Sequence, residues 1–345
     1  MKTLNLLEFF DEIKKRENID YPVLIKILEE VLLNAIKDEY GDNKNFNIIL
    51  NPNKNDFEIL HNRIIVKDEE FKDPISQIKF SEAYEINKEY NIGDKISEHI
   101  NILNFNRNTI LNIRKNLQLK ILEYKRNNIF NEYKEKIGKI VIGKVYKIWK
   151  NEILLLDEEN NEVILPKSEQ IPSDSFKEED IIKGVIIKVE IQNDNLNIII
   201  SRTSPMFLER LLEQEIKEIY NGLIVIKKIV RIPGERAKVA ITSYDDKIDP
   251  VAVCVGKKGS KIHNIVRELR NENIDIINYT NNTRLYIQRA LNPAKISDIK
   301  IIENEKKAKV YLNPDQISLA IGKKRVNIKL ASQLTGYDIN ICATK

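Results

Sequence analysis

The last third of this chain contains an internal repeat, which limits the folds that the chain can adopt. In the first copy, RAKVAI and DPVAVCV precede a Gly-Lys-Lys-Gly turn, which is followed by SKIHNIVREL and IDIINY. In the second copy, KAKVYL and PDQISLAI precede Gly-Lys-Lys-Arg, VNIKLASQLTG and YDINIC. Both copies predict a strand, a helix, a basic turn, a helix and a strand, with about five extra residues before the first turn. Two related α+β modules are therefore predicted in tandem.

The basic turn of the first copy can bring its backbone close to a ligand. Gly256 and Gly259 add no Cβ, and the helix that follows offers unpaired N–H groups to phosphate. Lys257 and Lys258 place positive charge in the turn, and Lys261 places it at the start of the following helix. A Gly-x-x-Gly turn between two helices and two strands is typical of the KH module, whose loop binds about four nucleotides of single-stranded nucleic acid.

The second turn departs from this pattern at its last position. It contains Gly322, Lys323 and Lys324, but Arg325 stands where the first copy has glycine. A side chain there would crowd a close backbone approach, although a guanidinium can bind phosphate through two hydrogen bonds. We expect these four residues and Lys329 to contact RNA, with less of the affinity in this turn than in the first.

The distribution of charge singles out the same part of the chain. The whole chain has a net charge of +4, yet residues 229–345 carry 21 basic and 12 acidic side chains, a net +9. Residues 1–130 have a net charge of −2, and residues 131–228 have −3. A basic module on a nearly neutral chain indicates a protein that binds the phosphate backbone of nucleic acid.

From Gly138 to about residue 202, the hydrophobic pattern has a period of two and predicts about five short strands. A five-stranded OB-type barrel is the economical fold at this size, and such barrels commonly bind single-stranded nucleic acid. Tyr146 and Trp149 are the candidate stacking residues, with a place in the barrel core as the alternative for each. Because they are three residues apart, a regular strand would place them on opposite faces, so we expect only one to be exposed.

The N-terminal third combines helical and strand-like patterns. Apolar residues at three- and four-residue spacing predict a helix from Tyr21 to Gly41, with Pro22 at its start. NFNIIL and FEILHNRIIV predict strands, and residues 108–125 predict a second helix. The expected apolar side of this second helix comprises Ile110, Leu117, Ile121 and Leu122.

These patterns predict a multidomain α+β protein with four parts. We expect an α+β N-terminal domain, an OB-type barrel, a linking helix with a first KH module, and a second KH module. Their predicted ranges are 1–130, 137–203, 204–289 and 290–345.

No catalytic or metal-binding constellation is recognisable in the sequence. His61, His99 and His263 are scattered and have no Ser, Cys or carboxylate partner identifiable by motif. Cys254 and Cys342 lie far apart in apolar runs, so a disulfide framework is not expected and both are interpreted as small buried hydrophobes. We therefore predict a protein that is not an enzyme and that needs no cofactor or metal. No run of about 18 apolar residues occurs, so we expect a cytoplasmic protein without a membrane span.

Several stretches resemble the NusA family of bacterial transcription factors. They are SEQIPSD, ISRTSP, RIPGERAKVAI, IDPV, VRELRNENIDI and LASQLTGYDINI. The resemblance covers the whole chain in the family's order: an N-terminal domain that binds RNA polymerase, an S-one-type OB barrel, and two KH modules of the prokaryotic topology. It implies a transcription elongation, termination and antitermination factor that binds polymerase and nascent single-stranded RNA. We expect a monomer, with other antitermination factors as further candidate partners.

One alternative function remains open on the sequence. A translational or ribosome-associated protein could use the same KH and OB modules without binding polymerase. Polynucleotide phosphorylase also carries KH and S-one modules, but the chain ahead of them here is too short for its catalytic core, and their order is reversed.

The sequence stops at Lys345 without the acidic C-terminal repeats of some family members, so we expect no autoinhibition by such repeats.

Overall fold

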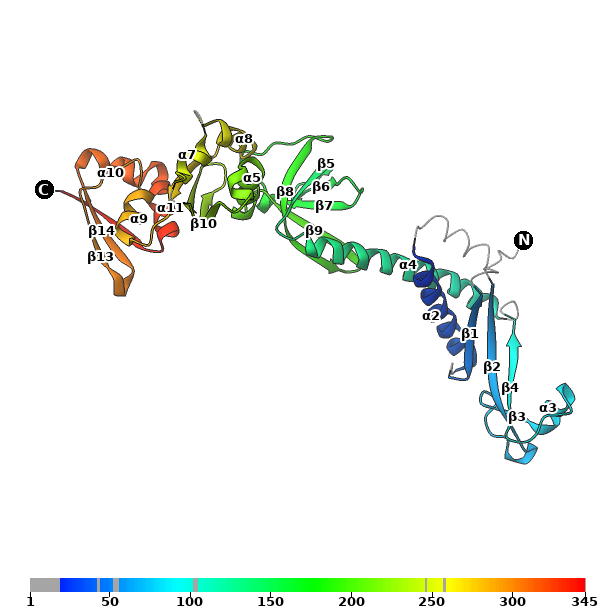
Figure 1. The fold of residues 1–345 in the computed structure, drawn as a ribbon. Coiled ribbons are helices and arrows are strands. Elements are labelled where there is room, and N and C mark those ends of the chain that lie inside the picture. Colours follow the sequence, from blue (N-terminus) through cyan, green and yellow to red (C-terminus); the bar gives the residue numbers. More distant parts are fainter. Residues whose placement is uncertain are drawn as a thin grey trace. The chain divides into compact units, whose positions relative to one another are not determined.

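A computed structural model describes residues 19–41, 44–51, 56–101, 105–245, 247–256 and 259–344 (Figure 1). The chain divides into two compact units, Met1–Ile129 and Phe130–Lys345. Each unit has hydrophobic clusters of its own. The first unit corresponds to the expected N-terminal α+β domain, and the second contains a barrel and two KH modules.

The first described helix, α2 (Tyr21–Tyr40), follows its sequence pattern closely. Pro22 lies in the first turn, and Gly41 ends the helix with a φ of 84°, a conformation in which its N–H donates to the carbonyl of Lys37. The seven residues predicted to form the apolar side are the buried ones. They are Leu24, Ile27, Leu28, Val31, Leu32, Ala35 and Ile36.

A four-stranded sheet lies with α2 in the first unit. Its central strand, β2 (Asp56–Val66), pairs antiparallel with β1 (Phe46–Asn51) and β4 (Lys95–Ile100), and parallel with β3 (Gln77–Lys79). The short helices η1 (Asp68–Glu70) and α3 (Phe80–Ile86) flank β3 in sequence.

Helix α4 (Arg107–Glu135) is longer than the predicted helix and runs across the boundary between the units. Ile113, Leu117 and Ile121 are buried in the cluster that contains α2, whereas Leu122 is 62% exposed. The expected apolar side was therefore wrong for Leu122. Because a helix turns 100° per residue, Ile113, Leu117 and Ile121, which are four positions apart, face the core together. Leu122 is rotated 100° away from Ile121 and faces solvent.

The second unit begins with the predicted OB-type barrel. Its five strands form a closed barrel in the order β5-β6-β7-β9-β8. Alternating apolar residues point inward; Val145, Leu155, Val163, Val185 and Ile200 are almost fully buried. The strands are β5 (Ile140–Ile148), β6 (Glu152–Leu156), β7 (Glu162–Pro166), β8 (Ile181–Gln192) and β9 (Asn195–Ser201), with η3 (Lys167–Glu169) after β7.

Two KH modules of the same topology follow the barrel. In each, the first two strands pair antiparallel and the second and third pair parallel. The first module comprises α5 (Pro205–Glu215), α6 (Lys217–Tyr220), β10 (Ile224–Ile232), β11 (Arg236–Ser243), α7 (Pro250–Val255), α8 (Ser260–Glu268) and β12 (Asn273–Asn278). The second comprises α9 (Thr283–Ala290), β13 (Asp298–Ile302), η5 (Glu303–Glu305), β14 (Lys307–Leu312), α10 (Pro314–Ile321), η6 (Lys323–Arg325), α11 (Val326–Thr335) and β15 (Asp338–Ala343).

The predicted linking helix is part of the first module's core. It is interrupted at Ile216, which leaves α5 and α6 as two helices. Phe207 and Leu212 from α5 share a hydrophobic cluster with Val239 of β11 and Ile265 of α8. The segment therefore packs within the first KH module.

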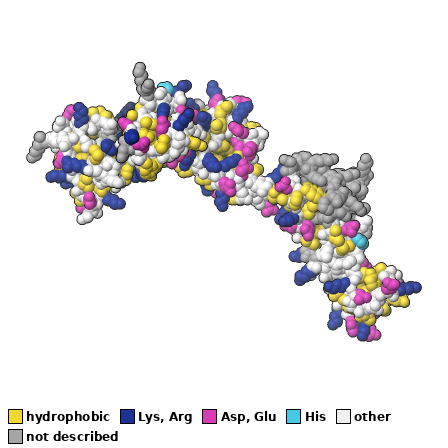
Figure 2. Space-filling model, in the orientation of Figure 1, with side chains coloured by type: hydrophobic (Ala, Val, Ile, Leu, Met, Phe, Trp, Pro, Cys, Tyr) yellow, Lys and Arg dark blue, Asp and Glu magenta, His cyan; other side chains and the backbone are white. Residues whose placement is uncertain are grey.

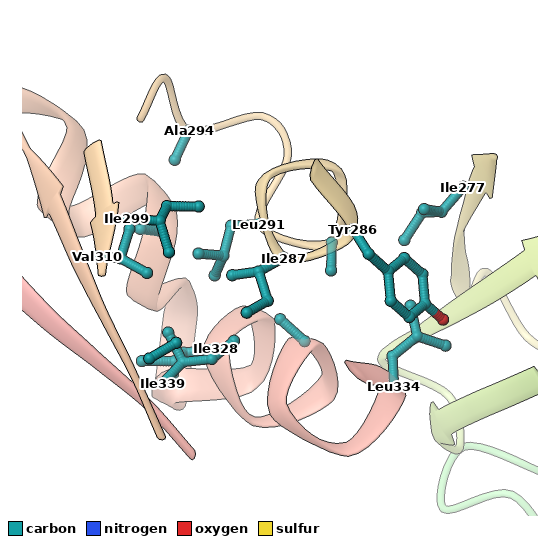
Figure 3. Close-up of a cluster of buried hydrophobic side chains, with 14 of the residues drawn as sticks. Ile277, Tyr286, Ile287, Leu291, Ala294, Ile299, Val310, Ile328, Leu334 and Ile339 are labelled. Atoms are coloured by element: carbon teal, nitrogen blue, oxygen red, sulfur yellow. The ribbon is translucent and has the colours of Figure 1, made fainter. Parts of the chain in front are cut away.

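The two KH modules share a hydrophobic cluster (Figure 3). Tyr286 and Ile287 of α9 pack there with Ile328 of α11, while Ile277 of β12 and Ala240 of β11 join from the first module. Alternate residues of β11 thus face opposite sides of their sheet, one toward the helices of the first module and one toward the second module. The division expected between residues 289 and 290 passes through α9.

A buried guanidinium joins the barrel to the first KH module. All five N–H groups of Arg202, which follows β9, donate hydrogen bonds over 2.7–3.3 Å. The acceptors on the barrel side are the Asp174 carboxylate and the Lys183 carbonyl; those on α8 are the carboxylate and carbonyl of Glu268. Arg270 also donates to Asp174, so this buried carboxylate is held by two guanidinium groups.

A second buried pair extends this junction. Arg231 of β10 binds both carboxylate oxygens of Glu272 at 2.9 and 2.6 Å, and it donates further to the carbonyls of Arg202 and Ser204. Buried charges are tolerated only when they are paired and their hydrogen-bonding groups are satisfied. The barrel and the first KH module are therefore held together by an interlocked set of charge-assisted hydrogen bonds, which we call the Arg202 junction.

Replacing Arg202 with Ala should destabilise the second unit strongly, because it leaves Asp174 buried and deprived of one guanidinium. Removal of one partner from a buried ion pair typically costs about 3–5 kcal/mol. Urea unfolding of the full chain, followed by the fluorescence of its single tryptophan, Trp149 in the barrel domain, measures this loss. Arg284→Ala is the control, since it breaks an exposed pair with Asp298 and should cost no more than about 1 kcal/mol. Equal losses in the two variants would contradict a special role for the junction.

Candidate nucleic-acid interface

The first KH loop lies between α7 and α8 and has the backbone geometry that its glycines allow. Gly256 ends α7 with φ 73° and ψ 175°, and Gly259 caps α8 with φ 77° and ψ 15°. Asp249 caps the start of α7 by accepting hydrogen bonds from two backbone N–H groups. Lys257 and Lys258, which were predicted to contact RNA, lie outside the described residues.

The second loop has nearly the same backbone conformation as the first at its two end positions, although the last of these is Arg325. Gly322 has φ 72° and ψ 166°, which match Gly256, and Arg325 has φ 63° and ψ 17°, which match Gly259. A left-handed conformation costs a residue other than glycine roughly 1–2 kcal/mol. A Cβ at Gly322 would lie 2.7 Å from the Cβ of Asn327, so this position requires glycine. Arg325 therefore adds a side chain to the loop while keeping the left-handed backbone conformation that Gly259 has in the first loop.

The basic side chains of the second loop are accessible, and one of them is paired. Lys323, Lys324, Arg325 and Lys329 are all exposed. The Nζ of Lys324 lies 3.3 Å from an oxygen of Glu235, which belongs to the turn between β10 and β11 of the first module. The second loop and the helix α11 that follows it therefore offer three accessible cations in addition to Lys324, which already has a carboxylate partner.

Lys261, at the start of α8, is paired within the first module. Its Nζ lies 3.0 and 3.2 Å from the two carboxylate oxygens of Glu218 on α6. The carboxylate of Glu218 accepts a hydrogen bond from the backbone N–H of Glu218 itself and another from Lys261, and both lower its pKa. This carboxylate is ionised at neutral pH and offsets part of the charge that the sequence placed at Lys261.

Tyr146 and Trp149 are both exposed, by 58% and 46%. The expectation that only one would be exposed was wrong because β5 contains a bulge. Val145 pairs with Leu155 and Lys147 with Leu154, so Tyr146 is an extra residue that breaks the alternation of faces. The ammonium group of Lys147 lies 5.4 Å from the centre of the Trp149 ring. These residues form a surface suitable for stacking and for phosphate, which we call the barrel aromatic surface.

Sequence reasoning missed the lysines around this surface. Lys144, Lys147 and Lys150 are exposed in and after β5, and Lys144 forms an ion pair with Glu179. The alternation of basic and aromatic residues in KVYKIWK is the signal that could have found them.

Asn327 was also missed, and it supports the second loop. It is buried at the position that corresponds to Lys261, and its amide donates to the carbonyls of Leu291, Leu319 and Ala320 at 3.1–3.3 Å. These contacts tie α11 to α10 and to the end of α9. Asn327 is one of several polar residues in α11, so the sequence gives no signal of this role.

Basic and acidic side chains are interspersed over the visible face of the two KH modules (Figure 2). No group of three or more His, Cys, Asp or Glu residues that could hold a metal ion occurs in the part of the chain that the structure describes. Burial raises the pKa of Cys254 to about 12, so its thiol is neutral at physiological pH, in keeping with the predicted buried hydrophobe. None of the helices with described residues is long and apolar enough to cross a membrane.

An OB barrel followed by two KH modules, each with a loop between its central helices, defines a class of multidomain RNA-binding protein. Family models assign the class more narrowly. The NusA N-terminal domain matches residues 5–127, the NusA-like first KH domain matches residues 202–279, and the NusA-like second KH domain matches residues 283–345.

Similar proteins span most of this chain. It is 36% identical over 302 residues to the transcription termination/antitermination protein NusA of Thermus thermophilus, which covers 88% of this chain and 78% of the relative. The protein with the same description from Bacillus subtilis is 33% identical over 337 residues, covering 97% of this chain and 90% of the relative. The chain belongs to the NusA family.

The two KH loops should differ in their contributions to RNA affinity. The double variant Lys257→Asp with Lys258→Asp reverses the charge of the first turn, and Lys323→Asp with Lys324→Asp does the same in the second. Both should lower the affinity for single-stranded RNA, because phosphate contacts are lost. Each lost contact should also reduce the slope of log affinity against log salt concentration by roughly 0.7. We expect a smaller loss from the second loop for two reasons. Lys324 is already paired with Glu235, and the side chain of Arg325 occupies space that a glycine would leave open for the close approach of RNA.

Fluorescence anisotropy titrations of both double variants measure these losses, with circular dichroism melts as the folding control. An equal or larger loss from the second loop, with both proteins folded, would show that Arg325 preserves the clamp and that the ranking of the loops is wrong.

Proposed function

We propose that this chain is a transcription elongation, termination and antitermination factor. Residues 1–130 bind RNA polymerase, while the barrel and the two KH modules bind nascent single-stranded RNA. The observation that supports this proposal is the matching backbone conformation at both ends of the two KH loops, in a chain of the NusA family.

The proposed RNA contacts divide into two physical kinds. Tyr146 and Trp149 offer ring faces on which bases can stack, and such stacking tolerates different sequences because every base has a π face. The loops offer glycine backbone, helix N-termini and cations to the phosphates. A protein that holds RNA in both ways occupies a segment of the transcript. The occupied segment can then neither pair with another segment nor be released, and this changes the fate of the transcript.

A translational RNA-binding protein without affinity for polymerase was the alternative. The match of residues 5–127 to the NusA N-terminal domain favours the transcriptional function, as do the descriptions of the relatives as termination/antitermination proteins. Other antitermination factors are candidate partners, and a monomer is the proposed state.

The two activities should separate between fragments of the chain. We expect residues 1–130 alone to retain the cognate polymerase in a pull-down, and residues 138–345 alone to bind RNA. The reverse pairings serve as controls. If the N-terminal fragment is folded and shows no interaction with polymerase, the translational function becomes the better explanation.

The full chain should prefer single-stranded RNA to duplex RNA, and its affinity should fall as salt concentration rises. Stacking requires bases that are free of a partner, and phosphate contacts release counterions when they form. Competition between labelled single strands and unlabelled duplexes, repeated at several salt concentrations, measures both properties. An affinity that is equal at low and high salt would exclude the proposed phosphate contacts.

A further inference from the structure

A groove of about 370 Å³ separates the barrel from the helices of the first KH module. The polar residues that line it come from three elements: Lys183 from β8, Gln214 and Glu215 from the end of α5, and Asn264, Arg267 and Glu268 from α8. The groove lies beside the Arg202 junction, which holds its two walls at a fixed separation. Because the groove lies between two modules proposed to bind RNA, the charged side chains that line it are candidates for contact with the same RNA.

Among the residues that the structure describes, the two cations of this groove have no acidic partner, whereas one of its two carboxylates is paired with Arg202 and the other, that of the exposed Glu215, accepts a hydrogen bond from a neutral amide. Within the described part of the chain, the side chains of Lys183 and Arg267 form no ion pair and no hydrogen bond. The carboxylate of Glu268 is bound by Arg202 at 2.7 Å, and that of Glu215 accepts from the Asn264 amide at 3.4 Å. An anion entering the groove therefore meets two cations that have no carboxylate partner.

The groove also connects the two RNA-binding surfaces. Helix α8 starts at the first KH loop, and Ser260, Asn264 and Arg267 lie on one exposed side of it because they are three or four residues apart. On the barrel, Lys183 pairs across strands with Ile142, which is followed by Lys144 and Tyr146 at alternate positions of β5. Lys183 thus lies on the strand that pairs with the one carrying Tyr146, and Arg267 lies on the helix that starts at the loop.

We propose that Lys183 and Arg267 bind RNA phosphates as the strand crosses from the barrel to the first KH loop. This inference rests on the proposed RNA-binding function and adds two residues to it. A planar guanidinium from α8 and a flexible ammonium from β8 both suit phosphate, and the amide of Gln214, which lines the same groove, can hydrogen-bond a base edge. This crossing makes the barrel and the first loop one binding site for a long RNA.

The test compares a short RNA with a long one on the full chain. An unstructured single strand of about 5 nucleotides fits one module, whereas one of about 20 nucleotides spans the barrel and the loop. Anisotropy titrations would use Lys183→Ala, Arg267→Ala and the double variant. The control is Lys188→Ala, which removes the same charge from the same strand at an exposed residue that pairs with Glu190 and does not line the groove.

We expect the double variant to lose about tenfold in affinity for the long RNA and less than about twofold for the short one. Losing two phosphate contacts should also lower the salt slope by about 1.4 for the long RNA. Lys188→Ala should leave both affinities within about twofold of the wild type. Thermal melts by circular dichroism verify folding, and Arg267→Lys should restore part of the loss because it keeps the charge.

Two results would overturn the inference while leaving the proposed function intact. One is wild-type affinity of the double variant for the long RNA, and the other is an equal loss for the short and long strands. A wild-type chain that binds neither strand would instead refute the proposed RNA-binding function itself.

Discussion

The structure of the second unit depends on one buried guanidinium. Arg202 can lie at the contact between the barrel and the first KH module only because every one of its N–H groups has an acceptor. Those acceptors belong to both domains, so any relative rotation would strand a charge away from water. Helix α8 carries Glu268 at one end and begins at Gly259 at the other. The orientation of the first loop relative to the barrel is thus set by the same interaction.

The junction also organises the charge of the surface around it. Arg202 engages the carboxylate of Glu268, which would otherwise compete for neighbouring cations, and Arg231 engages Glu272 in the same way. The charges of these two carboxylates are thereby paired with guanidinium groups of the junction. The excess of positive charge over residues 229–345 is left on the outside, where it can act on a polyanion.

Elements determined by local pattern could be predicted from the sequence. Helix α2, the barrel and the order of both KH modules follow from periodicity and turn residues, which act over a few neighbours. The exposure of Tyr146 with Trp149 could not be predicted, because a bulge is decided by pairing with β6. The Arg202 junction joins residues 28 and 66 positions apart, so no local signal reveals it. Its side chains nevertheless lie in SEQIPSD, ISRTSP and VRELRNENIDI, the stretches that carried the family resemblance.

The hydrophobic cluster shared by the two KH modules limits how far they can move relative to each other. Ile277 of the first module and Ile328 of the second are packed against the same helix, α9, so the modules cannot swing apart without exposing apolar side chains to water. The shared packing therefore fixes the interval between Gly256 and Gly322. With RNA bound at both loops as proposed, a fixed interval would favour transcripts whose two bound segments are separated by a matching number of nucleotides.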